Sequence, residues 1–274
     1  FSFASEIRAI SNLFDKNPEI DIETSYSYLI HGSYDNLEST FFKNISQLAP
    51  GHIANIKLSD PSKIEIKRWW NPSIELNSQL SFDEAAAKLR DIFLKNIKLH
   101  LRSDVPLCVN LSGGIDSSSI ACAIRHIDKD VAINTVSFVS PGSVDDEEHW
   151  IDLVNEHINA LPHKISLDSE GLSNDIDDMF ISQGEPFVSS SVYASYSIIR
   201  AVKESGFTVS LDGQGADEML AGYDGYPYGV IASMSSKKNY FGILKFLMAW
   251  KKWPGRSYFA AIKSLSNNLS NFFI

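Results

Sequence analysis

The chain has 274 residues, of which 44% are hydrophobic and 21% are charged, and its formal net charge is −10. This composition is typical of a globular protein with a sizeable core, in one large domain or two smaller ones. The negative balance argues against a general nucleic-acid binder, and no apolar run is long enough to span a bilayer. Cys108 and Cys122 lack the spacing of a zinc site or a disulfide framework, so we expect a cytoplasmic protein.

The first part of the chain predicts a mixed α/β segment. We expect a strand over residues 1–4, a short helix over 5–13, and paired strands over 53–57 and 63–68. A polar stretch without clear periodicity follows over residues 71–80, and we place a domain boundary there. The sequence therefore predicts a first domain over residues 1–72 and a second over 81–274.

The second part opens on a helix start signal. Ser81 is a typical N-cap, and Glu84 three residues later completes a capping box. An apolar stripe at helical spacing then runs along Phe82, Ala85, Leu89, Phe93 and Ile97.

Beyond Asp104 the pattern alternates between strands and helices. Strands are predicted over 107–111, 131–138, 164–167 and 208–211, and helices over 118–127, 146–158, 172–181 and 192–204. Such alternation predicts an α/β fold with a doubly wound parallel sheet, in which ligands bind beyond the carboxyl ends of the strands.

The turn after the first of these strands has the chemistry of a phosphate site. Its sequence is Ser-Gly-Gly-Ile-Asp-Ser-Ser over residues 112–118. The two glycines let the backbone approach an anion, hydroxyl groups can donate to phosphate oxygens, and the following helix presents its N-terminal amides. Asp116 would repel a bare phosphate, which indicates a bridging Mg²⁺. The alternative is an ordinary capped strand-to-helix turn.

A second polar turn follows the last predicted strand, with the sequence Asp-Gly-Gln-Gly-Ala-Asp-Glu over residues 212–218. In a parallel sheet this turn opens on the same edge as the first, so Asp116 and Asp217 could share one Mg²⁺. The alternative for Asp217 and Glu218 is a pair of acids favoured by the dipole at a helix start.

Together these motifs resemble a known family. Residues 112–118 are similar to the pyrophosphatase loop of the ATP-pyrophosphatase superfamily. With residues 212–218 and Leu220-Ala221-Gly222-Tyr223 they resemble the synthetase domain of glutamine-dependent asparagine synthetases. The segment over 184–186 is similar to a family segment near the substrate pocket. Residues 3–7, 48–52 and 68–70 resemble the end of that family's class II glutaminase domain.

The resemblance implies an adenine nucleotide α-hydrolase-like fold and an ATP-dependent amide-forming ligase. Such an enzyme adenylates a carboxylate, most simply that of aspartate, releases pyrophosphate, and transfers glutamine-derived ammonia with loss of AMP. The adenine would lie near Leu111 and Phe138, and Asp116 and Asp217 would hold Mg²⁺. The implied phosphate and nucleotide contacts are Ser112, Gly113, Gly114, Ser117, Ser118, Asp212 and Gly213.

Some features limit what the resemblance implies. Gln214 stands at a catalytic position where many asparagine synthetases carry an acid, and a neutral amide cannot act as a general base. The alternatives are therefore a relative that builds other amides, β-lactams or cyclic peptides, and a catalytically silent ATP-binding scaffold. A homodimer is a further expectation. Because the chain starts at Phe1, we expect the glutaminase domain to be truncated, and we expect the synthetase domain to continue past residue 274.

Overall fold

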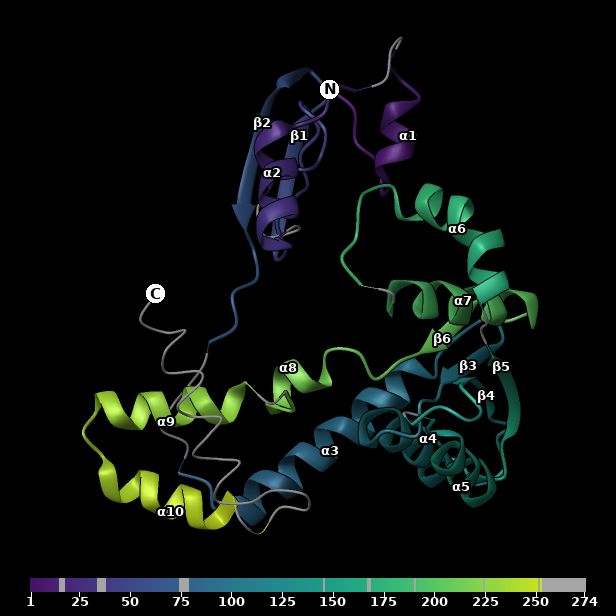
Figure 1. Ribbon diagram of the computed structural model, residues 1–274, viewed down its shortest axis with the longest axis vertical. Helices are drawn as coiled ribbons and strands as arrows, with labels where there is room; N and C mark the ends of the chain where they lie inside the picture. Colours follow the sequence, from purple (N-terminus) through teal and green to yellow (C-terminus); the bar gives the residue numbers. More distant parts are fainter. Residues whose placement is uncertain are drawn as a thin grey trace. The chain divides into compact units, whose positions relative to one another are not determined.

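The computed structural model describes residues 1–14, 18–33, 38–73, 79–144, 146–166, 169–189, 191–223, 225–250 and 252 (Figure 1). The chain divides into two compact units, one ending at Asp212 and one beginning at Gly213. The boundary predicted between residues 72 and 81 stays a prediction, and residues 74–78 of that stretch lie outside the described residues.

The first unit contains the predicted parallel sheet. Its four strands have the order β5-β4-β3-β6, and every neighbouring pair is parallel, which confirms the α/β prediction. The chain steps from β3 outward through β4 to β5 and then returns to place β6 on the other side of β3. The strands are β3 (Leu107–Asn110), β4 (Asn134–Val139), β5 (Leu161–Ser166) and β6 (Val209–Leu211).

Helices cover both faces of this sheet (Figure 1). Helices α4 (Ile115–Ile127) and α5 (Glu148–Ile158) share a core with Val109 of β3 and with Leu111, which directly follows β3. Helix α7 (Ser191–Glu204) packs on the opposite face through Ala201 and Val202, against side chains of β3 and β4. Successive strand residues point to opposite faces, so a short apolar strand contributes to both cores.

Helix α3 (Phe82–His100) begins as predicted. Ser81 and Glu84 form the full capping box, in which the Ser81 hydroxyl oxygen accepts from the Glu84 amide and the Glu84 carboxylate accepts from the Ser81 amide. The apolar stripe is only partly used, because Ile97 is buried and Phe93 half-buried while Phe82 remains 86% exposed. The carboxyl-terminal half of the helix therefore carries its packing against α4.

Helices α6 (Ser169–Gln183) and α7 are braced by an ion pair. The Arg200 guanidinium forms two hydrogen bonds of 2.6 Å with the two oxygens of Asp175, and Tyr193 donates a third to the same carboxylate. The bond to Arg200 is the main reason that the pKa of Asp175 lies below its ordinary value.

The N-terminal part of the first unit holds two short helices and a hairpin. Strands β1 (His52–Lys57) and β2 (Asp60–Arg68) are antiparallel, and helix α1 spans Ile7–Ser11, as the sequence predicts. Helix α2 (Ile22–His31), capped by Asp21, was not predicted. The strand predicted over residues 1–4 is wrong, because these residues pair with no strand among those described.

The second unit is helical where it is described. It contains α8 (Ala216–Leu220), α9 (Tyr226–Ser236) and α10 (Tyr240–Trp250), and α9 and α10 pack on each other. Ile231 and Trp250 are its buried apolar side chains among the described residues. Across the described part of the chain, no helix has both the length and the apolar character needed to cross a membrane.

A buried hydrogen bond between β4 and α5 gives a stability prediction. The Thr135 hydroxyl donates to Asn155 Oδ1 over 2.7 Å, and both residues are buried. We expect Thr135→Val to lower the free energy of unfolding by about 1–3 kcal/mol, because it leaves a buried acceptor without its donor. Chemical denaturation measures this loss. Thr135→Val combined with Asn155→Leu removes both partners and should recover part of it, whereas an unchanged Thr135→Val stability would contradict the assignment.

Candidate nucleotide-binding site

The strand order creates one edge that is suited to a ligand. The chain leaves β3 toward β4 on one side, and β6 returns to the other side, so the direction of winding reverses between β3 and β6. In open parallel sheets, ligands bind beyond the carboxyl ends of the strands at such a reversal. The register pairs Val109 with Leu211, which brings the residues after each strand to the same edge.

The turn after β3 is internally braced by hydroxyl groups. Ser117 Oγ accepts the Ser112 amide at 3.2 Å and lies 3.1 Å from Ser112 Oγ. Ser112 Oγ also accepts the Gly114 amide at 3.2 Å. Ser117 is buried, whereas Ser112 is exposed at the mouth of the turn. The turn is therefore held in shape by its own side chains, and Ser112 is the hydroxyl best placed to meet a ligand.

Gly113 is required by both backbone and space. Its φ is +82°, in the left-handed region, and a Cβ there would lie 2.9 Å from the Trp150 Cβ and 3.1 Å from the Ile151 amide nitrogen. The turn thus packs directly on the first turn of α5. No side chain fits at this position without moving that helix.

Helix α4 begins at Ile115, three residues earlier than predicted. Gly114 is its N-cap and supplies no side-chain cap, so the helix start presents backbone amides at the sheet edge. Asp116 is half-buried in this first turn. Ser118 Oγ is buried and has no hydrogen-bond partner among the described residues, so its predicted phosphate contact would need the turn to shift.

The site contains a residue that sequence reasoning missed. Asn110, the last residue of β3, donates from Nδ2 to Asp212 Oδ2 over 2.9 Å and lies 3.4 Å from Ser210 Oγ. Asn110 is 8% exposed. This bond fixes the first acid of the second turn across the β3–β6 pair. The available signal was a polar amide at the end of an otherwise apolar buried strand.

The adenine contacts are predicted at Leu111, which directly follows β3, and at Phe138 of the neighbouring strand β4. The Leu111 side chain is 1% exposed and belongs to the core, so only its backbone faces the edge, and its amide donates to the Val136 carbonyl oxygen. Phe138 is half-buried near the end of β4. The acidic run after β4 includes Asp146, whose carboxylate accepts the amides of Ser140 and Glu148. Its neighbour Asp145 lies outside the described residues.

The second turn crosses into the second unit after Asp212. There the left-handed Gly215 is the N-cap of α8, and the Ala216 amide donates to the Gly213 carbonyl oxygen. Asp217 folds back on Gly222, where an added Cβ would lie 1.7 Å from Asp217 Oδ1. Because Asp116 and Asp217 belong to different units, a shared Mg²⁺ stays a prediction, as does the role of Gln214.

The described residues supply no complete metal site by themselves. No group of three or more His, Cys, Asp and Glu side chains gathers there as a metal site. Burial raises the pKa of the Cys108 thiol to about 11 and also raises that of Cys122, so neither is an activated nucleophile.

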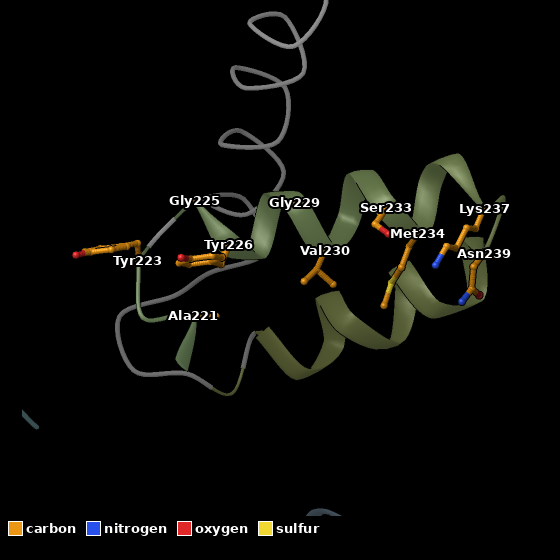
Figure 2. Close-up of a pocket in the computed structure, with 10 residues that line it drawn as sticks. All are labelled: Ala221, Tyr223, Gly225, Tyr226, Gly229, Val230, Ser233, Met234, Lys237 and Asn239. Atoms are coloured by element: carbon orange, nitrogen blue, oxygen red, sulfur yellow. The ribbon is translucent and has the colours of Figure 1, made fainter. Parts of the chain in front are cut away.

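A groove of about 860 Å³ lies within the second unit, at helix α9 (Figure 2). Tyr223 and Tyr226 stack at one end with their ring centroids 6.2 Å apart, and Lys237 and Asn239 lie at the other. Tyr223 also donates to Glu218, and this bond raises the pKa of the Tyr223 hydroxyl. Between these ends the groove is lined by Gly229, Val230, Ser233 and Met234.

The fold places this chain among α/β proteins with a doubly wound parallel sheet, here with a glycine- and serine-rich turn where the direction of winding reverses. Comparison with known families is more specific. The family model described as asparagine synthase matches residues 88–269, and the chain belongs to this family. That match confirms the resemblance of the synthetase part, while the glutaminase-like tail stays a prediction.

Similar proteins include ligases and proteins named as amidases. The chain is 29% identical to asparagine synthetase 3 of Bacillus subtilis, over 81% of this chain and 38% of that protein. It is 28% identical to the amidase chyE of Penicillium rubens, over 68% of this chain and 30% of that protein. The chain therefore spans less than two fifths of the length of these relatives.

Two left-handed glycines offer a matched test of the turn. Gly113 and Gly142 have φ values of +82° and +83°, but nothing lies within 4 Å of a Cβ placed at Gly142. We expect Gly142→Ala to cost about 1 kcal/mol from backbone strain alone. Gly113→Ala should cost about 1–3 kcal/mol more because of the clash with α5. Chemical denaturation compares the two, and equal losses would mean that the close approach to Trp150 has no energetic weight.

Asn110 gives a second test. Asn110→Leu keeps the approximate volume but removes the donor to Asp212. We expect the affinity for ATP, the nucleotide that the sequence resemblance implies, to weaken by roughly 5–10-fold, the equivalent of one hydrogen bond, as measured by calorimetry. Ser210→Ala, which removes only the 3.4 Å partner, is the control and should change ATP affinity less than twofold. Equal affinities in wild type and Asn110→Leu would remove Asn110 from the site.

Proposed function

We propose that this chain is the ATP-using part of an amide-forming ligase that produces AMP and pyrophosphate. A carboxylate oxygen of the acceptor attacks the α-phosphorus of ATP, and the bond to pyrophosphate breaks. Ammonia derived from glutamine then attacks the acyl carbon, and the bond to AMP breaks. The observation that carries the proposal is the braced Ser112–Ser117 turn at the winding reversal of a sheet in an asparagine synthase family member.

The roles of the residues follow from the turn. The Ser112 hydroxyl and the amides at the start of α4 would donate to phosphate oxygens, and Gly113 lets the backbone approach them. Ser117 holds the turn in place rather than binding directly, since it is buried and bonded to Ser112. Because these donors are fixed before ATP arrives, little reorganisation is needed at the moment of reaction.

We propose that Asp116, with Asp217 as the second predicted ligand, would hold Mg²⁺ that arrives with ATP. Asp116 is half-buried beside the amide donors, and Asp217 follows Asp212 by five residues along the chain. One or two carboxylates plus substrate phosphates are the usual Mg²⁺ ligands. When bound, the ion would neutralise charge on the pyrophosphate. The chain's own part is to orient the α-phosphate and to supply these two carboxylates.

The acceptor is most simply aspartate, with asparagine as the product. Another carboxylate is the second candidate, favoured by the neutral Gln214 and by the relatives named as amidases. Gln214 can orient a substrate group by hydrogen bonds but cannot take up the proton that the attacking nitrogen loses.

Product analysis tests the reaction class. The full-length protein, given MgATP, aspartate and ammonium or glutamine, should release AMP and pyrophosphate. Asp116→Asn should reduce turnover roughly 100-fold by removing charge at the phosphates. Asp83→Asn is a matched control, since Asp83 is an exposed acid in the first turn of α3, and it should leave turnover unchanged. Release of ADP and phosphate would reject the proposal, as would an Asp116→Asn variant with full activity.

A further inference from the structure

The loop that joins α6 to α7 also bonds to the distant N-terminal part of the first unit. The Glu185 carboxylate accepts the Phe41 amide over 2.8 Å, across a separation of 144 residues. Two residues further on, the Phe187 carbonyl oxygen accepts the Tyr28 hydroxyl over 2.6 Å. The loop thus binds the N-terminal part at two places, at Phe41 through a side-chain acceptor and at Tyr28 of α2 through a backbone acceptor.

The Glu185 carboxylate supplies the acceptor for the buried backbone amide of Phe41. Phe41 is 7% exposed, and its carbonyl oxygen accepts the Asp21 amide at the cap of α2. Its own amide is satisfied by Glu185 rather than by a neighbouring strand. A buried amide without an acceptor is unfavourable. The carboxylate therefore takes the place of a missing strand partner, and removing it affects the ordering of residues 38–46.

The loop itself is fixed on its other side. Helix α6 ends at Gln183 and is followed by Gly184, whose φ of +76° reverses the chain and whose amide donates to the Phe180 carbonyl oxygen. The Phe187 ring then stacks on Phe180 at 5.0 Å between centroids. Beyond the loop, α7 is held to α6 by the Arg200–Asp175 pair. The N-terminal part is thus bonded to a loop that is itself fixed by its contacts with α6 and by the ion pair between α6 and α7.

Helix α7 connects this loop to the candidate site. Helix α7 packs through Ala201 and Val202 on Cys108 of β3 and Val136 of β4. The chain then passes from α7 into β6, which is directly followed by Asp212, the acid held by Asn110. A displacement of the loop would therefore act on the helix that lies behind the strands carrying the nucleotide turns.

We propose that the α6–α7 loop is the docking point through which the N-terminal part is coupled to the candidate site, with Glu185 and Tyr28 as positioning residues. Both act through the hydrogen bonds that they make, Glu185 with the Phe41 amide and Tyr28 with the Phe187 carbonyl oxygen. Their role is to hold residues 21–33 and 38–46 against residues 184–189. The functional side of this inference rests on the proposed function, because it concerns nitrogen delivered from glutamine.

The first arm of the test is hydrogen exchange, which does not depend on activity. In the full-length protein, Glu185→Ala and Tyr28→Phe should each speed amide exchange roughly 5–10-fold over residues 38–46 and also over 184–189, the effect of losing one hydrogen bond. Glu185→Gln keeps an acceptor oxygen and is the matched control, with exchange like wild type. Unchanged exchange in Glu185→Ala and Tyr28→Phe would overturn the docking point, as would equal acceleration in Glu185→Gln.

The second arm compares nitrogen sources in the same variants. Glu185→Ala and Tyr28→Phe should lower AMP formation driven by glutamine at least fivefold relative to formation driven by ammonium, while the KM for ATP stays unchanged. Equal losses with both nitrogen sources would overturn the coupling. If wild type forms no AMP with either source, the proposed function fails and the coupling to glutamine fails with it, while the exchange arm still decides the docking point.

Discussion

The pairing of β3 with β6 is the constraint on which the rest of the structure depends. These strands are distant in sequence, and their parallel register places the residues after both strands at one edge. Without this pair, the serine-rich turn and Asp212 would belong to unrelated parts of the surface. The Asn110–Asp212 bond reinforces the pair at the point where a ligand would bind. The same interaction therefore organises both the sheet and the candidate site.

The sheet itself could be predicted because buried parallel strands leave a local signal. Short apolar runs bounded by glycine, proline and polar residues predicted β3 to β6 within a few residues, and the capping box of α3 was visible from Ser81 and Glu84. Helix α2 was missed although Ile22, Tyr26 and Leu29 recur at helical spacing, and none of its residues is buried. The strand expected at residues 1–4 failed because local composition cannot supply a pairing partner.

The functional residue types of the candidate site could be predicted from the sequence, but the residues that hold them in position could not. Serine, glycine and aspartate in residues 112–118 indicate phosphate binding by their type, so the turn could be identified from sequence. The residues that position it act across long separations: Trp150 sets the space at Gly113, and Asn110 reaches Asp212. No pattern within either segment encodes such contacts. They depend on which elements the fold brings together.

The fold of Asp217 against Gly222 has a consequence for how this acid can vary. A single methyl group on residue 222 would overlap the Asp217 carboxylate. The orientation of the Asp217 side chain therefore depends on Gly222, which has no functional group of its own. An alanine there would leave every polar group of the turn unaltered and still force the acid to swing elsewhere. The absence of a side chain at this glycine is therefore as much a part of the acid's placement as the carboxylate itself.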